Sequence, residues 1–220
     1  MTEVILFSDK SKIQQSVKDV LSDLNINLVA VVTEKNPNLK LLPKADLLIC
    51  VCYHYKISSN IIKKYPVAIN FHPAPLPEYK GWAVYNFGLY NNEDRWGVSA
   101  HYITDKIDRG EILAVQYFDI GKETVKSLRE KSHSKLIYLF KNIITAFKNG
   151  EKINSIENQG GTYYSQKMFE ELREIKTHMD SKEIEKRIRA CHFPPYKGAY
   201  IKLGDQNFMI LQEDFYDTNI

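Results

Sequence analysis

The chain has 220 residues, of which 44% are hydrophobic and 26% charged, and these proportions are typical of an ordinary globular protein. Its 30 basic and 27 acidic residues leave a net charge of only +3, with no basic tract for a polyanion, although a small phosphorylated substrate remains compatible. The length suffices for one sizeable core with a small appended part.

The sequence offers no targeting, membrane or disulfide signal. The start M-T-E-V-I-L-F-S-D lacks a basic segment before an apolar run, and no stretch approaches the roughly 18 apolar residues of a membrane span. The three cysteines are irregularly spaced, and Cys50 and Cys52 lie in an apolar strand pattern, so we expect buried thiols and no metal. These features predict a cytoplasmic protein without membrane association.

The first seventy residues alternate between strand and helix patterns. A continuous apolar run such as Leu47–Tyr53 is typical of a strand covered on both faces. The alternation predicts an α/β protein with a mostly parallel sheet flanked by helices. The predicted strands are Val4–Phe7, Leu28–Val32, Leu47–Tyr53 and a strand from Val67, and the predicted helices are Lys12–Leu24 and one from Ser58 or Ser59 to Lys64.

The second half of the chain continues this pattern and then changes in texture beyond Gly161. We predict a helix at Val84–Tyr90, strands at Gly97–Ile103 and Ile112–Asp119, a long helix at Thr124–Lys148 ending at Asn149-Gly150, a helix opening at Asp180, and a hairpin of Tyr200–Leu203 and Asn207–Leu211 turning at Gly204-Asp205. We therefore expect a main domain at 1–150 and a C-terminal extension of helix and β-hairpin at 151–220, packed on it.

The stretch V-A-I-N-F-H-P-A-P-L-P-E-Y-K-G, residues 67–81, has the pattern of a site for chemistry. Asn70 and His72 are two residues apart at the end of a predicted strand, so both side chains should lie on one side of the sheet. Prolines at 73, 75 and 77 prevent further strand pairing and fix an extended loop. Ligands of open parallel sheets bind at this end of the strands.

A carboxylate from the segment D-K-I-D-R-G, residues 105–110, would complete the site. His72 with a carboxylate partner can act as a general base, and Asn70 can donate to developing negative charge. No serine or cysteine adjoins the cluster, which favours direct transfer over a covalent intermediate. Local patterning alone leaves structural roles open, because a His-Pro after a strand and an Asp in a loop are common turn residues.

The string N-x-H-P-x-x-L-P-x-Y-K-G, followed by Asp108 in I-D-R-G, resembles the folate-dependent formyltransferase family. The resemblance extends over most of the chain, including G-V-S-A-H-Y-I-T-D-K-I-D-R-G-E-I-L and the later G-G-T-Y-Y. It implies a Rossmann-like formyltransferase fold, 10-formyltetrahydrofolate as co-substrate without a metal, and Asn70, His72 and Asp108 as the catalytic trio. Asp108 is preferred over Asp105 because it occupies the motif position.

Among the branches of this family, the chain is most similar to the nucleotide-sugar N-formyltransferases. The segments G-W-A-V-Y-N-F-G-L-Y-N and R-I-R-A-C-H-F-P-P-Y-K-G-A-Y carry this likeness. It implies formylation of the amine of a dTDP-linked or other nucleotide-linked amino-deoxy sugar, for surface polysaccharide (lipopolysaccharide O-antigen) synthesis, by a homodimer. The tRNA-formylating branch carries an additional barrel domain and basic surface, so no nucleic-acid partner is expected. The alternatives are a phosphoribosylglycinamide formyltransferase and a non-catalytic folate-binding relative.

The resemblance also implies ligand contacts, each with a structural alternative. The pterin would bind at Tyr53, His54, Tyr55 and Ile57, which could instead be loop packing. A pyrophosphate would meet Lys80 with Tyr79 beside it, and the sugar would meet Trp82 and Tyr85, although a solvated lysine and core aromatics are equally ordinary. Phe193 and Tyr196 would stack on a nucleobase, or anchor the hairpin or a dimer contact. His101 is interpreted as structural, and His133 and His178 as surface residues.

Overall fold

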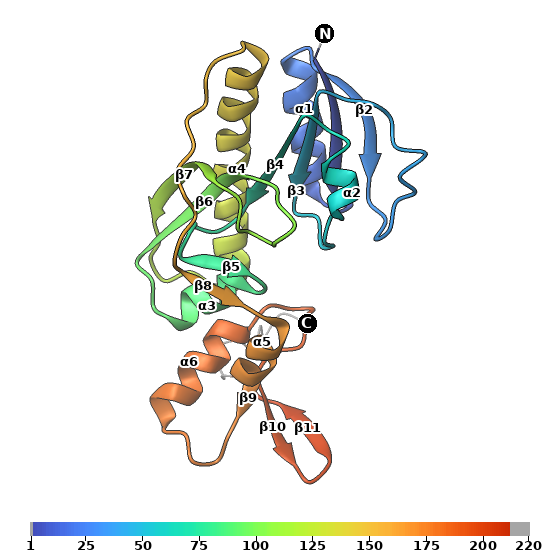
Figure 1. Cartoon of the computed structure of the whole chain (residues 1–220). Coiled ribbons are helices and arrows are strands. Elements are labelled where there is room, and N and C mark those ends of the chain that lie inside the picture. The colour runs from blue at the N-terminus through green and yellow to red at the C-terminus, as the bar shows by residue number, and fades with distance from the viewer. Residues whose placement is uncertain (1, 212–220) are drawn as a thin grey trace.

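A computed structural model describes residues 2–211 and contains a central six-stranded sheet. Figure 1 shows this sheet in the upper part of the molecule and a group of smaller elements below it. In spatial order the strands of the sheet are β2 (Asn27–Val32), β1 (Glu3–Ser8), β3 (Leu47–Val51), β4 (Val67–His72), β6 (Arg95–Tyr102) and β7 (Ile112–Asp119).

The predicted mostly parallel sheet is confirmed. Strands β2, β1, β3 and β4 pair in parallel, whereas β6 runs antiparallel to both β4 and β7. The reversal at β6 places its residues directly opposite those of β4, with His101 facing Asn70 in register. The carboxyl end of β4 is therefore flanked by β3 on one side and by the reversed strand on the other.

Alternation along β1 explains why the sheet is covered on both faces. Val4 and Leu6 pack into one apolar cluster, and Ile5 and Phe7 into another. All four side chains are fully buried, as expected for the two faces of a doubly covered strand. The helices are α1 (Lys12–Asp23), α2 (Ser59–Ile62), α3 (Val84–Tyr90), α4 (Val125–Lys148), α5 (Gln166–Arg173) and α6 (Ser181–Cys191).

Helices α1 and α4 cover the face to which Val4 and Leu6 point, and α2 covers the other. The N-terminus of α4 is capped by Thr124, whose hydroxyl oxygen accepts from the backbone N–H of Ser127 while the Ser127 side chain accepts from the backbone N–H of Thr124. The predicted end of this helix is confirmed: Asn149 is the C-cap, and Gly150 follows in a left-handed conformation with φ of 70°. None of the helices within the described residues is long and apolar enough to cross a membrane.

The C-terminal part holds the predicted helix α6 and the hairpin, together with short elements that the sequence did not predict. The hairpin strands β10 (Tyr200–Leu203) and β11 (Gln206–Met209) turn at Gly204 as expected. The unpredicted elements of this part are β8 (Thr162–Tyr164), α5 and β9 (Glu174–Ile175), and β5 (Tyr79–Gly81), in the loop after β4, was also not predicted. The short strands carry no readable periodicity, because each exists only through its pairing partner.

Pairing between β5 and β8 ties the C-terminal part to the loop after β4. The two strands run parallel, with Lys80 opposite Tyr163. Helix α6 packs on α3, and the side-chain amide of Asn86 on α3 donates to the carbonyl of Ala190 on α6 at 2.8 Å. The division at residue 150 stays a prediction, and residues 212–220 of the extension lie outside the described part of the chain.

The entry into β8 depends on glycine at position 161. Gly161 has φ of 66°, and a Cβ built on it would lie 1.6 Å from the carbonyl oxygen of Pro77. Its neighbour Gly160 has φ of 73° but open space around it, so the two positions differ in crowding and share the backbone conformation.

We expect Gly160→Ala to lower the free energy of unfolding by about 1–2 kcal/mol, the cost of a left-handed alanine. Gly161→Ala should lower it by at least about 3 kcal/mol, because the backbone of the Pro77 loop must also move. Denaturant unfolding of both variants measures the difference. Equal losses in the two variants would show that the close approach to Pro77 has no energetic weight.

Candidate active site

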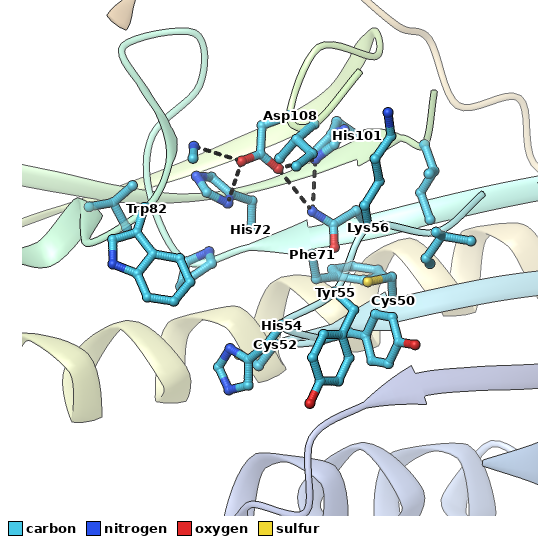
Figure 2. Close-up of a pocket in the computed structure, with 18 of the residues that line it drawn as sticks. Cys50, Cys52, His54, Tyr55, Lys56, Phe71, His72, Trp82, His101 and Asp108 are labelled. Atoms are coloured by element: carbon cyan, nitrogen blue, oxygen red, sulfur yellow. Dashed lines mark hydrogen bonds and ion pairs between the residues drawn. The ribbon is translucent and has the colours of Figure 1, made fainter. Parts of the chain in front are cut away.

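Asn70 and His72 leave the carboxyl end of β4 on the same side, as their spacing predicts, and both meet Asp108 from the loop between β6 and β7. Figure 2 shows His72 and Asp108 facing each other. The three side chains line a cavity of about 300 Å³. His72 and Asp108 are almost completely buried. Asp105, the other candidate carboxylate, is exposed and lies outside the cavity lining.

The carboxylate of Asp108 is the centre of the cluster. Its Oδ2 accepts from the backbone N–H of Gly81 at 2.9 Å and lies 3.6 Å from Nδ1 of His72. Its Oδ1 lies 3.4 Å from both Nδ2 of Asn70 and Nε2 of His101. One buried charge is thus surrounded by groups from β4, β5 and β6, which is the environment that a buried carboxylate requires.

The contacts of His72 decide which of its ring nitrogens is basic. Nε2 lies 2.8 Å from the carbonyl oxygen of Tyr79, which can only accept, so in the neutral ring Nε2 carries the hydrogen. Nδ1 is then the nitrogen with the lone pair, and it faces Asp108. A proton arriving at Nδ1 would be stabilised by the carboxylate beside it.

His101 has the opposite tautomer and orients Asn70. Its Nδ1 lies 2.8 Å from the carbonyl oxygen of Tyr102 and therefore donates, so Nε2 accepts from Nδ2 of Asn70 at 2.9 Å. The second hydrogen of the Asn70 amide points to Oδ1 of Asp108 across the longer distance of 3.4 Å. Both hydrogens of this amide are thereby directed, one by a short contact and one by a weak contact that is easily exchanged.

The loop that carries Asp108 is fixed from the C-terminal side. Asp108 has φ of 53°, a left-handed conformation that aspartate tolerates better than most residues. The side-chain amide of Asn158 donates to the carbonyls of Asp108 and Gly110, at 3.0 and 2.9 Å. Asn158 thus holds the backbone on both sides of Arg109.

Burial and charge act in opposite directions on His72. Burial lowers the pKa of the His72 imidazole, and the Asp108 carboxylate only partly restores it, so the ring is neutral at neutral pH. Burial alone would raise the pKa of the Asp108 carboxyl, but attraction to the His72 and His101 rings when they are protonated, together with the Gly81 N–H, holds it well below its usual range. The site therefore combines a neutral base with a permanent negative charge.

The predicted pterin residues line the cavity. Tyr53, His54, Tyr55 and Ile57 all belong to its wall. The Tyr53 hydroxyl donates to the carbonyl of Glu34 at 2.5 Å, and Nε2 of His54 lies 3.2 Å from Oδ2 of Asp9. Their role in binding a pterin stays a prediction.

The predicted substrate residues divide into two groups. Trp82, which is 46% exposed, and Tyr85 line the cavity. Tyr79 and Lys80 do not, and this corrects the sequence interpretation. Pairing of β5 with β8 buries both side chains: Nζ of Lys80 donates to the carbonyl of Gly160 at 2.6 Å, and the Tyr79 hydroxyl donates to Glu93 at 2.6 Å.

Phe193 and Tyr196 lie outside the cavity lining but are linked to it by Arg129. The two rings are 5.0 Å apart, and the guanidinium of Arg129, which does line the cavity, lies 5.8 Å from the centre of the Phe193 ring. Tyr196 is 64% exposed. The nucleobase role of these rings stays a prediction.

Sequence reasoning missed several residues of the site. His101, interpreted as structural, is opposite Asn70, and His133, interpreted as a surface residue, lines the cavity together with Arg129. The 3.6-residue period of α4 places Arg129 and His133 on one face, but no sequence signal says what that face meets. Within residues 2–211 no group of three or more His, Cys, Asp or Glu side chains is arranged to hold a metal ion.

Comparison with known proteins gives consistent matches. Residues 9–140 match the formyl transferase family. Over 163 residues the chain is 34% identical to the bifunctional polymyxin resistance protein ArnA of Wigglesworthia glossinidia brevipalpis, covering 72% of this chain and 24% of the relative. Curated methionyl-tRNA formyltransferases also match, and the chain spans 54–62% of their length.

Two solved structures illustrate the shared fold. A 4-N formyltransferase from Francisella tularensis superposes with a TM-score of 0.84 at 19% identity, covering 96% of this chain and 97% of that one. The formyltransferase PseJ from Anoxybacillus kamchatkensis, solved with UDP-4,6-dideoxy-4-formamido-L-AltNAc and tetrahydrofolate, superposes with a TM-score of 0.68 at 24% identity. The PseJ match covers 77% of this chain and 88% of PseJ.

The hydrogen bonds predict opposite tautomers for the two histidines of the site. Two-dimensional ¹⁵N–¹H spectra of the imidazoles at neutral pH should show His72 protonated at Nε2 and His101 protonated at Nδ1, because each of these nitrogens donates to a backbone carbonyl. His178, which is exposed, serves as the internal reference. A proton on Nδ1 of neutral His72 would contradict the geometry.

Proposed function

Because the chain belongs to the formyl transferase family, we propose that it transfers the formyl group of 10-formyltetrahydrofolate to the amine of a nucleotide-linked amino-deoxy sugar. The observation that carries the proposal is the meeting of Asn70, His72 and Asp108 in one cavity, with a neutral imidazole beside a buried carboxylate. A neutral base next to a fixed negative charge is what removal of a proton from an attacking amine requires.

The cavity wall formed by Tyr53, Tyr55 and Ile57 suits the pterin ring. Lys56 and Lys106, which also line the cavity, are exposed and could meet the carboxylates of the folate tail. The folate supplies an activated formyl group and leaves as tetrahydrofolate. The residues of this chain then have to orient the amine, accept its proton and stabilise the developing negative charge.

In the proposed reaction, Nδ1 of His72 accepts the proton that the amine loses as its nitrogen forms a bond to the formyl carbon. Asp108 stabilises the resulting imidazolium from 3.6 Å away, and the Tyr79 carbonyl keeps the ring oriented through Nε2. His72 then returns the proton to the folate nitrogen as the bond between that nitrogen and the formyl carbon breaks. The ring therefore acts first as base and then as acid.

Asn70 would stabilise the negative charge that develops on the formyl oxygen. Its contact with His101 at 2.9 Å keeps the amide in place, while its contact with Asp108 at 3.4 Å is long enough to be exchanged for the oxyanion. His101 in this mechanism is a positioning residue, because it touches Asn70 and Asp108 and not the reacting atoms.

The choice of a sugar amine is supported by the fold neighbour PseJ, which was solved with a UDP-linked formamido sugar, and by the half-exposed Trp82 in the cavity lining. The proposal includes a dTDP-linked sugar, a role in O-antigen synthesis, a cytoplasmic location and a homodimer. The curated matches to methionyl-tRNA formyltransferases make the initiator tRNA a competing acceptor that the experiment must include.

An acceptor screen tests the proposal directly. Purified protein is incubated with 10-formyltetrahydrofolate and, in turn, amino-deoxy sugars linked to thymidine, uridine and guanosine diphosphates, glycinamide ribonucleotide, and methionyl-tRNA. Folate product is followed by absorbance, and the formyl group on the acceptor by mass. Formylation of a nucleotide-linked sugar supports the proposal, and formylation of glycinamide ribonucleotide or methionyl-tRNA alone contradicts it.

His72→Ala should lower kcat by roughly 100-fold to 10,000-fold, the usual contribution of a general base. The matched control is His178→Ala, since His178 is exposed and distant in sequence from every residue of the site. Steady-state kinetics and the dissociation constant of folate are measured for both variants. Near-normal turnover in a folded His72→Ala protein would remove the imidazole from the mechanism.

The pH dependence of kcat/KM should follow the pKa of His72. Activity should fall with decreasing pH as the ring becomes protonated, with a midpoint below the ordinary histidine value of about 6.5, because burial lowers this pKa. Asp108 raises the pKa of His72, so Asp108→Asn should shift the midpoint of the residual activity to still lower pH. A midpoint that stays in place or rises in Asp108→Asn would show that the acid limb does not report His72.

A further inference from the structure

One wall of the cavity has no role in the mechanism above. It is formed by Arg129 and His133 from α4, Tyr85 from α3 and Cys52 at the end of β3, and we call it the α4 wall. Sγ of Cys52 lies 3.8 Å from Nε2 of His133. Trp82, which lies two residues before α3, lines the same cavity as this wall and the catalytic cluster.

Three of the four side chains on the α4 wall are uncharged at neutral pH. Burial, together with the charge of Arg129, lowers the pKa of His133 to about 4, and burial raises the pKa of Cys52 to about 12. Burial also raises the pKa of the Tyr85 hydroxyl well above its ordinary value. Arg129 is therefore the charged group of this wall.

Among residues 2–211 Arg129 forms neither an ion pair nor a hydrogen bond to a carboxylate, although Asp9 is near enough for the two charges to attract each other. The nearby Asp9 interacts instead with His54 at 3.2 Å and accepts from the hydroxyl of Ser11. The aromatic ring that the guanidinium contacts within this described range is that of Phe193, 5.8 Å away. A half-buried arginine is favourable when its donors are used, so this one is arranged for a ligand.

A second donor on the same wall is also without a partner. The hydroxyl of Tyr85 is buried and makes no hydrogen bond to any described residue. Tyr85 and Arg129 are close enough for the guanidinium charge to influence the phenol. A guanidinium and a hydroxyl on one cavity wall, both without a hydrogen-bond acceptor among the described residues, are complementary to the oxygens of a phosphate group.

We propose that Arg129 binds the diphosphate of the nucleotide-linked acceptor, with the Tyr85 hydroxyl as a second donor. This inference rests on the proposed function and assigns its phosphate recognition to α4. Arg129 takes the role that the sequence suggested for Lys80, whose ammonium is used by the Gly160 carbonyl. A planar guanidinium can hold two phosphate oxygens at once, which a lysine cannot.

The position of Arg129 also connects the phosphate to a surface for the base. Its guanidinium lies over Phe193, and the Phe193 ring lies 5.0 Å from the ring of Tyr196, which is exposed. A diphosphate on Arg129 therefore leaves the sugar on the side of Trp82 and the nucleoside on the side of these two rings. Aromatic faces of this kind suit a nucleobase.

The test is the affinity for nucleoside diphosphates, measured by calorimetry on the full-length protein without folate. The probes are dTDP, UDP and GDP, with thymidine, uridine and guanosine as the phosphate-free counterparts. Arg129→Met removes the charge and keeps the stem on Phe193, and Arg129→Lys keeps the charge. The matched control is Arg95→Met, because Arg95 also stacks on a ring, 4.5 Å from the centre of Tyr117, but lies outside the cavity lining.

We expect wild type to bind one nucleoside diphosphate far more tightly than its nucleoside. Arg129→Met should weaken the affinity for the diphosphate by roughly tenfold or more, as expected for loss of a charge-assisted hydrogen bond. Its affinity for the nucleoside should not change. The diphosphate affinity of Arg129→Lys should lie between those of wild type and Arg129→Met. Tyr85→Phe should lower this affinity to a smaller extent than Arg129→Met, and Arg95→Met should have the affinity of wild type. Unchanged diphosphate affinity in Arg129→Met, or no diphosphate preference in wild type, would overturn the assignment.

Formyl transfer separates this assignment from the proposed function. If wild type formylates a nucleotide-linked sugar and Arg129→Met retains its KM, the role of Arg129 is wrong and the proposed function stands. A KM raised by roughly tenfold or more at nearly unchanged kcat supports the assignment, because phosphate binding remote from the reacting atoms contributes equally to ground and transition states. Folate affinity and thermal unfolding confirm that the variants are folded.

Discussion

The burial of the Asp108 carboxylate is the constraint on which the site depends. A charge in this position is tolerated only if groups from several elements converge on it, and here they are the Gly81 N–H, His72, Asn70 and His101. The reversed strand β6 makes this possible, because it places His101 directly opposite Asn70. The loop after β6 then returns Asp108 to the end of β4. The geometry of the site therefore depends directly on the topology of the sheet.

The same charge gives each neighbour its role. With Nε2 of His72 donating to the Tyr79 carbonyl, the basic nitrogen is Nδ1, and the carboxylate stabilises a proton there. The elements that hold this geometry come from both ends of the chain: β8 pairs with β5 next to Tyr79, and Asn158 holds the backbone of Asp108. The C-terminal part therefore does more than extend the fold, since it supports the loop on which the proposed chemistry rests.

Period and spacing sufficed for the six strands of the central sheet, for every helix except α5, and for the shared side of Asn70 and His72, because these depend on local geometry. Period and spacing could not distinguish Asp108 from Asp105, and only the resemblance to a family did so. They also could not identify His101, because its role follows from the register between β4 and β6. Lys80 shows the opposite error. It follows the catalytic loop directly in sequence, yet the pairing of β5 with β8 buries it outside the cavity lining, whereas Arg129, 49 positions later, lines the cavity. Contacts between distant segments decide such cases.

The most direct measurement of the central claim is a structure of the protein with tetrahydrofolate and the nucleotide-linked amino sugar that it accepts. The account predicts that the amine nitrogen lies within hydrogen-bond reach of Nδ1 of His72, about 3 Å, while Nε2 still donates to the Tyr79 carbonyl. An amine that approaches Nε2, or that contacts Asp108 with His72 out of reach, would contradict it. In the first case the base would act through its other nitrogen, and in the second the imidazole would not be the base.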